Sequence, residues 1–372
     1  MILENINNTT NLRTVLVAPL NWGLGHATRC IPIIHALMEL KISVVLAASG
    51  STATVLQKEF PTMKILHLEG YNITYGRTKS SFRFALLTQA PGFIRSIRRE
   101  RRWLEKLLKS EQFDAVISDN RFGMSHPSLS SVYITHQLNI QTGNKLLNWI
   151  AQRIHYHFIN RFSECWVPDH ASAQNMGALL SHPKVYPAVA VKYLGLLSRF
   201  KKIPSPIDIS LLIILSGPEP QRSILEAILL EQINEAGLEA VFVRGLPSGP
   251  PLNTTLYPNL VIYNYVPAAE LSMLIQRSET IISRCGYSTV MDLALLGKKA
   301  VLVPTPGQTE QEYLAGYLHQ KGYFFTSPQE RFQLTKCIRE AASFNWQPFP
   351  EWRDDYQKVI SNFINGLPNR LI

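Results

Sequence analysis

The segment from residue 13 to residue 48 restricts the fold more than any other feature of the sequence. Residues 13–20 (RTVLVAPL) form a nearly continuous apolar run, which is typical of a strand buried on both faces of a parallel sheet. A turn with two glycines follows, then apolar residues at helical spacing to about Leu40, then a second strand at residues 42–48. Parallel strands need a crossover between them, and a helix is the usual one. The sequence therefore predicts a βαβ unit and an α/β fold.

A second α/β unit follows a change in composition. The basic stretch SRFKKIPSPI at residues 198–207 contains two prolines, which is typical of a linker. One hydrophobic core rarely serves 372 residues, so we predict two Rossmann-like domains, each a doubly wound parallel sheet, facing a central cleft. Their predicted bounds are 1–198 and 208–348, and a terminal helix at 350–366 is expected to pack back toward the N-terminal domain. Further predicted strands are 115–118, 132–135, 164–167, 210–215, 240–244, 260–263, 280–283 and 300–303, and further helices are 145–161, 268–277, 309–321 and 328–343.

The charge balance indicates an anionic partner. The chain carries 37 Lys and Arg against 27 Asp and Glu, a formal charge of +10. Such a charge suits a nucleic acid, a lipid surface or a phosphorylated substrate. The sequence has no zinc finger, no RNP-like aromatic signature and no lysine-rich tail, so we expect no nucleic acid partner.

Cysteine spacing and hydropathy indicate a cytoplasmic protein. The four cysteines are widely separated without a Cys-x-x-Cys pair, so we predict neither a zinc site nor a disulfide framework. No segment approaches the roughly 18 consecutive apolar residues of a membrane span. The first residues also lack the basic start and apolar core of a signal peptide.

The turn at residues 21–26 (NWGLGH) lies between the first strand and its helix, where helix amides favour an anion. A dinucleotide site would need a third glycine, where Thr28 stands, and an acid after the second strand, so NAD is not expected. We expect Gly23 and Gly25 to bring His26 to the edge of the sheet, where imidazole could accept a proton or hold a phosphate or sugar oxygen. The alternative is that the glycines only shape the turn and His26 caps the helix.

Two later strands end in polar residues. Asp119 follows one predicted strand and His136 follows another, so both should lie near His26 if the sheet is parallel. We interpret His26, Asp119 and His136 as candidate catalytic residues. The competing interpretation is that Asp119 and His136 form turns or helix caps.

The strongest indication of a ligand site in the sequence lies at residues 283–313 (SRCGYSTVMDLALLGKKAVLVPTPGQTEQEY). A strand ends at Ser283, a glycine permits close approach, and Ser288-Thr289 open a helix whose first turn carries Asp292. A short strand then ends in a proline-rich turn before a helix with a polar start. Two helix N-termini would thus converge on one crevice, where amides and hydroxyls suit a phosphate and Gln308 or Gln311 could hold a sugar.

At these residues the sequence resembles the family 28 glycosyltransferases, whose best-known member transfers N-acetylglucosamine to a lipid-linked peptidoglycan precursor. Arg284, Gly286, Thr289, Val290 and Asp292 stand in register with the family's arginine, glycine, threonine, valine and helix-borne acid. The resemblance covers roughly residues 211–323 and implies the GT-B architecture. In two places the sequence departs from the family: Asp292 replaces the usual glutamate, and Asn21-Trp22 replaces a glycine pair.

The resemblance also implies how a nucleotide-diphosphate sugar binds. The turn Ser216-Gly217 would contact the diphosphate, Asp292 the ribose, and the backbone near Tyr265-Val266 the uracil of a UDP-linked donor such as UDP-N-acetylglucosamine. With Gly23 and Gly25 on the acceptor side, the predicted donor-binding residues are Ser216, Gly217, Tyr265, Val266, Arg284, Gly286, Ser288, Thr289, Asp292, Gln308, Thr309 and Gln311.

A basic, aromatic-rich stretch occupies residues 75–109. An apolar stripe at helical spacing runs through it, so its arginines could form the solvated face of a core-packed helix. Alternatively, that face could rest on an anionic lipid surface on the inner side of the membrane. Its densest basic run is Arg95, Arg98, Arg99, Arg101 and Arg102.

Together these features predict a metal-independent hexosyltransferase that moves a sugar from a nucleotide-diphosphate donor to a glycan or lipid-linked acceptor. No Asp-x-Asp pair is present to hold a divalent ion, and no cofactor is expected. Two alternatives stay open. One is a nucleotide-sugar 2-epimerase with the same architecture, and the other is a non-catalytic subunit that binds a nucleotide sugar.

Overall fold

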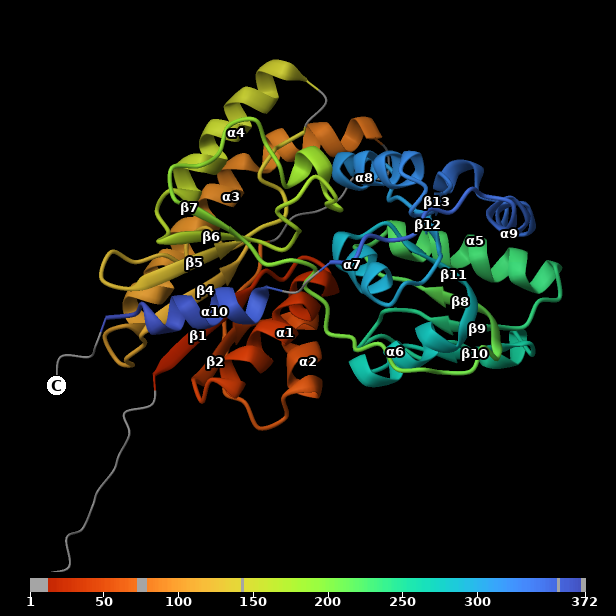
Figure 1. Cartoon of the computed structure of the whole chain (residues 1–372), viewed down its shortest axis with the longest axis horizontal. Coiled ribbons are helices and arrows are strands. Elements are labelled where there is room, and N and C mark those ends of the chain that lie inside the picture. The colour runs from red at the N-terminus through yellow and green to blue at the C-terminus, as the bar shows by residue number, and fades with distance from the viewer. Residues whose placement is uncertain (1–12, 72–78, 142–143, 353–354, 369–372) are drawn as a thin grey trace, which may run out of the picture.

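The computed structural model describes residues 13–71, 79–141, 144–352 and 355–368, with backbone only for residues 79–90 and Lys145. The start of the predicted N-terminal domain at 1–12, residues 75–78 of the basic stretch and residues 353–354 of the predicted terminal helix lie outside the described residues. Within those residues the chain forms two α/β domains side by side (Figure 1).

The N-terminal domain is built on a seven-stranded sheet with the order β3-β2-β1-β4-β5-β6-β7, and every pairing in it is parallel. Apolar side chains fill β1, β2 and β4 because helices cover both faces of the sheet. The strands are β1 (Thr14–Pro19), β2 (Ser43–Ala48), β3 (Ile65–His67), β4 (Ala115–Asp119), β5 (Ser130–Ile134), β6 (Glu164–Val167) and β7 (Ala190–Tyr193). The helices are α1 (Leu24–Glu39), α2 (Gly50–Glu59), α3 (Lys79–Leu107) and α4 (Lys145–Ile159).

The C-terminal domain has a six-stranded parallel sheet with the order β10-β9-β8-β11-β12-β13. The two predicted parallel sheets are therefore confirmed. The strands are β8 (Ile209–Ile214), β9 (Ala240–Val243), β10 (Leu260–Tyr263), β11 (Ser278–Arg284), β12 (Val301–Val303) and β13 (Phe325–Thr326). The helices are α5 (Gln221–Glu235), α6 (Ala268–Arg277), α7 (Tyr287–Leu295), α8 (Thr309–Gln320) and α9 (Leu334–Ala342).

The last helix, α10 (Tyr356–Asn365), returns to the N-terminal domain, where Figure 1 shows it in blue against that sheet. Arg13 donates to the carbonyls of Ile364 and Leu367, and Phe363 meets Trp166 edge-on with ring centroids 5.4 Å apart. These contacts anchor the end of the described chain on the first domain.

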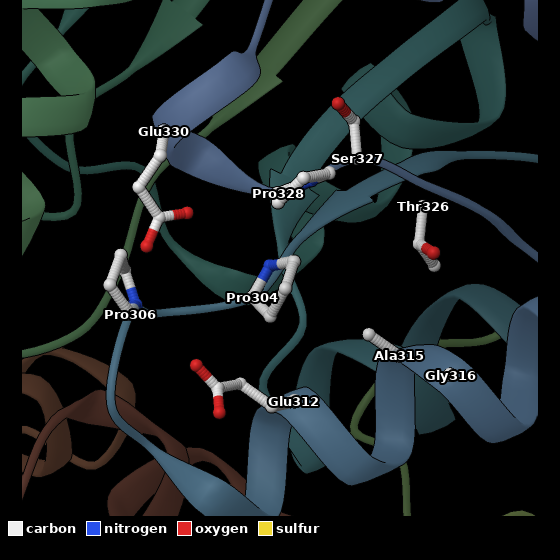
Figure 2. Close-up of a pocket in the computed structure, with 9 residues that line it drawn as sticks. All are labelled: Pro304, Pro306, Glu312, Ala315, Gly316, Thr326, Ser327, Pro328 and Glu330. Atoms are coloured by element: carbon white, nitrogen blue, oxygen red, sulfur yellow. The ribbon is translucent and has the colours of Figure 1, made fainter. Parts of the chain in front are cut away.

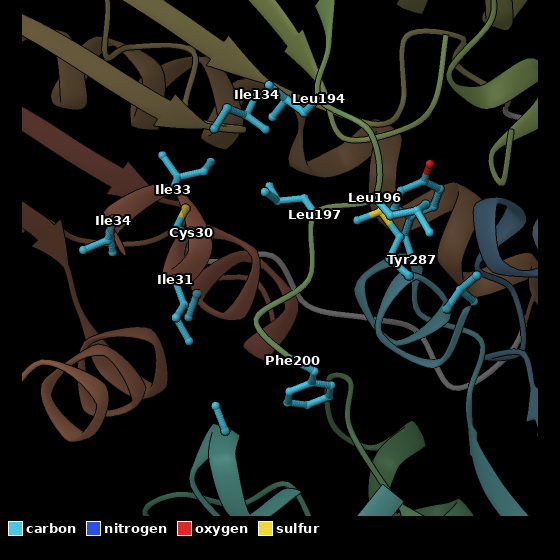
Figure 3. Packing of buried hydrophobic residues seen from close by; sticks show 14 of the residues in the cluster. Cys30, Ile31, Ile33, Ile34, Ile134, Leu194, Leu196, Leu197, Phe200 and Tyr287 are labelled. Atoms are coloured by element: carbon cyan, nitrogen blue, oxygen red, sulfur yellow. The ribbon is translucent and has the colours of Figure 1, made fainter. Parts of the chain in front are cut away.

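A single hydrophobic core continues from one domain into the other. Ile31 and Ile33 of α1 belong to the same buried cluster as Tyr287 of α7. Leu196 and Leu197, which follow β7 and lead toward the second domain, lie between them and are 0% and 1% exposed (Figure 3). The first part of the segment that joins the domains is therefore packed into the protein interior, whereas residues 201–204 that follow it are exposed.

The structure differs from the predicted elements in several regions. The helix predicted at 328–343 is a short 3-10 turn (Gln329–Arg331) followed by α9, because Phe332 and Gln333 adopt extended backbone between them. Strand β7 was not predicted, because its four residues alternate between exposed and half-buried and lack an apolar run. Strands β3 and β13, which span three and two residues, and helix α2 were not predicted either.

Candidate functional site

The carboxyl ends of β1, β4 and β5 bring three predicted residues to one edge of the N-terminal sheet. β4 pairs in parallel with both neighbours, so the residues at these strand ends lie side by side. Asp119 ends β4, His136 follows β5, and the glycine turn after β1 leads into α1. Gly23 has a φ of +80°, a conformation that glycine adopts without strain, and the turn places His26 at the start of α1.

Arg29, one turn further along α1, joins these side chains. Its Nε donates to Asp119 Oδ2 at 2.6 Å, and its Nη2 donates to Asp119 Oδ1. The same Nη2 lies 2.9 Å from His26 Nδ1, and Nη1 lies 2.8 Å from His136 Nδ1. His26 Nδ1 is also 3.2 Å from Asp119 Oδ1. The side chain of Arg29 is 2% exposed and that of His26 is 14% exposed, so His26 is the member closer to solvent.

Burial and charge together set the protonation of the cluster. Burial alone would raise the pKa of the Asp119 carboxyl, but Arg29 and His26 outweigh it and lower the pKa to about 2. Burial also lowers the pKa of His26, where Asp119 opposes the effect and Arg29 adds to it. At neutral pH Asp119 is therefore an anion and His26 a neutral imidazole.

The C-terminal domain closes over this cluster. Glu310, at the start of α8, is 2.6 Å from His136 Nε2, and the Tyr287 ring stacks on the His136 ring at a centroid distance of 4.1 Å. Ser288 Oγ donates to the Gly25 carbonyl at 3.1 Å. The glycine turn and the polar start of α7, which are far apart in the sequence, are thus in direct contact.

Several predicted donor-binding residues surround this contact. Gly286 immediately precedes α7 and Thr289 lies in its first turn, while Gln308 immediately precedes α8. Thr309 Oγ1 donates to the Gln141 carbonyl at 2.7 Å, which links α8 to the loop after His136. Gln311 Oε1 accepts from the Thr305 backbone at 2.9 Å and so shapes the turn before α8.

The other predicted phosphate turn lies between β8 and α5. Gly217 has a φ of +103°, and a Cβ at this position would meet no atom within 4 Å. Ser216 beside it is half-buried. The turn is thus open on the side of Gly217, which would allow a phosphate to approach the backbone closely.

Arg284 does not lie on the surface of the cleft, as its predicted phosphate contact would require. It is 1% exposed and donates to the Gln221 carbonyl at 2.5 Å and to the Pro304 carbonyl at 3.4 Å. Burial, with a contribution from Arg222, lowers its pKa to about 9. Arg284 therefore connects the start of α5 to the turn after β12, and its charge would reach a phosphate only through these elements.

Asp292 makes a contact that its predicted role does not include. Its Oδ1 accepts from Ser198 Oγ at 2.5 Å, so the carboxylate ties α7 to the segment between the domains. Burial raises its pKa to about 6, although Arg199 and Ser198 oppose the shift. The predicted ribose contact would have to use the remaining lone pairs of this short side chain, which is 8% exposed.

The predicted uracil contact lies against the N-terminal domain. Lys58 Nζ is 4.7 Å from the centroid of the Tyr265 ring, and Val266 is 2% exposed within the shared core. The Ala268 amide at the start of α6 donates to Glu59 Oε1 at 2.9 Å. Helix α2 therefore covers this turn from the opposite domain.

A cavity of about 290 Å³ opens next to the turn after β12. Figure 2 shows the carboxylates of Glu312 and Glu330 directed toward its interior. None of the predicted site residues lines it, so we place the chemistry at the His26 cluster. The lining residues are Pro304, Pro306, Glu312, Ala315, Gly316, Thr326, Ser327, Pro328 and Glu330.

The structure adds two residues to the site, Arg29 and Glu310. For each of them the sequence contains a feature that could have identified it as a site residue. Arg29 is a charged residue in an otherwise apolar run of α1, and such a residue is rarely buried without a partner. Glu310 is an acid in the first turn of α8, where a carboxylate is favoured by the helix dipole.

Known proteins resemble this chain in sequence and in fold. Residues 248–359 match the glycosyltransferase family 28 C-terminal domain. An uncharacterized glycosyltransferase of Methanosarcina mazei is 22% identical over 351 residues, which cover 86% of this chain and 87% of that protein. The crystal structure of the kitacinnamycin glycotransferase superposes with a TM-score of 0.61 at 13% identity, covering 95% of this chain and 94% of that one.

The chain is therefore a glycosyltransferase with the two-domain GT-B fold. Its C-terminal domain resembles family 28 in particular. A third relative is the UDP-N-acetylglucosamine–N-acetylmuramyl-(pentapeptide) pyrophosphoryl-undecaprenol N-acetylglucosamine transferase of Rhodopseudomonas palustris. It is 29% identical over 123 residues, which cover 32% of this chain and 30% of that protein.

Proposed function

We propose that the enzyme transfers a sugar from a UDP-linked donor, such as UDP-N-acetylglucosamine, to a hydroxyl of a glycan or lipid-linked acceptor. The observation that carries the proposal is the His26 cluster, which lies where loops of both domains meet. As the acceptor oxygen attacks the anomeric carbon, His26 accepts the hydroxyl proton. The bond between the sugar and the phosphate oxygen breaks, and the nucleoside diphosphate leaves.

Helix N-termini would stabilise the departing diphosphate. In the first turn of α5 the Ser223 amide donates to Glu219 Oε2 at 3.2 Å, whereas α7 and α8 begin without a side chain that caps their first amides. Their N–H groups can therefore donate to phosphate oxygens, with the helix dipoles adding positive potential. Arg284 adds a buried positive charge beside the start of α5, whereas the charge of Arg222 is offset by Glu219 and Glu226. These groups act where negative charge develops in the transition state.

The preference for a UDP-linked donor is supported by the third relative. Its name specifies UDP-N-acetylglucosamine, and the likeness extends over 123 residues. The predicted uracil contact at Tyr265-Val266 follows β10, at the carboxyl edge where parallel sheets bind nucleotides.

The epimerase alternative fits the site less well. Such an enzyme would need an acid and a base near the sugar, and Asp119 is bound through both oxygens to Arg29. The depressed pKa of Asp119 leaves no proton to donate at neutral pH. We therefore favour transfer, and the experiment below separates it from epimerisation and from simple binding.

The test is a thermal-shift screen of the purified chain against UDP-, GDP- and ADP-linked sugars. A donor at a concentration 100 times its Kd should stabilise the protein by about 2.7 kcal/mol. Release of nucleoside diphosphate only when acceptor is present would support transfer. An isomerised sugar without acceptor would support the epimerase, and binding without either product would support a non-catalytic subunit. No shift with any of these sugars would refute the donor site.

We also propose that the N-terminal domain contacts an anionic membrane surface on the cytoplasmic side. Arg95, Arg98, Arg99, Arg101 and Arg102 of α3 are exposed. Helix α4 presents an apolar outer face, with Leu146 66%, Trp149 57% and Ile154 49% exposed. Phe122 packs against Phe93 of α3 and Phe158 of α4, so the two helices are neighbours. Basic residues beside exposed Trp and Leu are typical of an interfacial helix.

No helix among the described residues is long and apolar enough to cross a bilayer.

Binding to vesicles that contain anionic lipid should weaken when this surface is changed. Replacing Arg98 and Arg102 by Gln should lower the affinity by about fivefold for each charge, since a basic residue near such a surface contributes about 1 kcal/mol. Trp149→Ser should also weaken binding, whereas Met273→Ser, at an exposed position on α6, should not. Co-sedimentation at low and high salt measures these effects, and equal binding by all variants would contradict the proposal.

A further inference from the structure

The guanidinium of Arg29 uses four of its N–H groups on the residues of the candidate site. Nε–H and one Nη2–H bind the two oxygens of Asp119. The second Nη2–H points to His26 Nδ1 at 2.9 Å, and one Nη1–H points to His136 Nδ1 at 2.8 Å. A planar guanidinium carries five such donors, so each contact has its own hydrogen.

These contacts fix which nitrogen of each imidazole carries a proton. A guanidinium has no acceptor and keeps its protons, so a ring nitrogen that faces it must present a lone pair. His136 therefore accepts at Nδ1, and its Nε2–H donates to Glu310 Oε1 at 2.6 Å. By the same reasoning, His26 accepts at Nδ1 and carries its proton on Nε2.

The opposite tautomer of His26 would need a different partner. A proton on Nδ1 could bind Asp119 Oδ1 at 3.2 Å, but it would also face the Arg29 donor at 2.9 Å. A doubly protonated ring would meet the same donor, and burial lowers the pKa of His26 although the charge of Asp119 opposes the shift. Because the contact with Arg29 is shorter than the contact with Asp119, we assign the His26 proton to Nε2.

We infer that Arg29 is a positioning residue that sets the tautomer of His26 and thereby controls when His26 can act as a base. In the conformation of the structure Nε2 carries the proton and cannot accept another. His26 becomes a base when Arg29 moves away from Nδ1, Nε2 releases its proton to water, and Nδ1 takes a proton from water and keeps it in a hydrogen bond to Asp119 Oδ1. The number of protons on the ring is unchanged. The role of His26 as base rests on the proposed function, whereas its tautomer does not.

The test is to record 15N NMR spectra of the whole chain labelled at histidine, at neutral pH. The His26 signals are assigned by their loss in His26→Gln. In the unmodified chain we expect a protonated Nε2 and an unprotonated Nδ1. In Arg29→Lys, which keeps the charge but loses the planar fork, we expect the His26 proton to move to Nδ1. Arg121→Lys, at another buried arginine that pairs with Glu100, should leave the His26 signals unchanged.

Two results would overturn the inference. One is a protonated Nδ1 on His26 in the unmodified chain, and the other is an unchanged tautomer in Arg29→Lys. If Arg29→Lys does not fold, the inference is tested by the unmodified chain alone, through the protonation of His26 Nδ1 in its spectrum. Neither result depends on turnover, so failure of the inference can be told apart from failure of the proposed transfer reaction.

Discussion

Replacing His26 by alanine should lower kcat by about 10²- to 10⁴-fold, the usual contribution of a general base. Donor binding should persist, because the proposed donor groups lie in the other domain. Wild-type activity requires neutral His26 and is lost as the pH falls through its pKa. Since burial lowers that pKa below 6.5, the acid limb of the kcat/KM profile should lie below pH 6.5. Initial rates across pH and donor-induced thermal shifts provide the measurements.

A matched control for this experiment is present on the same helix. His35 is exposed on α1 and contacts the Phe60 ring at a centroid distance of 5.1 Å. His35→Ala should keep near-normal turnover. A His26→Ala enzyme that is as active as His35→Ala would rule out the proposed base.

Replacing Asp119 by alanine should destabilise the protein by about 3–5 kcal/mol, because Arg29 would remain buried without its counter-ion. The carboxyl pKa is lowered from 3.8 to about 2, so its contribution is fully present above the ordinary pKa and is lost as the pH falls toward 2. This pH-dependent part amounts to about 2 kcal/mol. Urea unfolding at neutral and acidic pH should therefore show a difference between variant and wild type that narrows in acid.

The control for Asp119 is an aspartate in an exposed pair. Asp208 binds Arg277 through two hydrogen bonds of 2.7 and 2.6 Å, and the two side chains are 46% and 41% exposed. Solvent screens this pair, so Asp208→Ala should change stability little. An equally large loss in both variants would show that burial of Arg29 is not the cause.

The arrangement of strands was predictable because buried parallel strands carry long apolar runs. Strands β6 and β10 lie where their composition predicts, at Glu164–Val167 and Leu260–Tyr263. Strand β7 was not predicted from the sequence, because its side chains are only partly buried. A local pattern indicates a strand where it carries an apolar run, as in the edge strand β10, and indicates little where a charged residue interrupts the run, as Lys192 does in β7.

The candidate site was only partly predictable, because its geometry depends on contacts between distant segments. Asp119 and His136 were predicted as site residues because each follows a strand. In a parallel sheet the carboxyl ends of neighbouring strands lie at the same edge. Whether Arg284 reaches the cleft or lies beneath it depends on the carbonyls of Gln221 and Pro304, which no local pattern specifies. For the same reason the sequence could not show that Asp292 binds Ser198.

The packed segment between the domains has a consequence for engineering. Leu196 and Leu197 bury their side chains between α1 and α7, so separating the halves would expose apolar surface on both. Chimeras that exchange the C-terminal half with a relative would have to preserve this surface. The crossover point should therefore be chosen to keep Leu196, Leu197 and the facing side of α7 from the same parent.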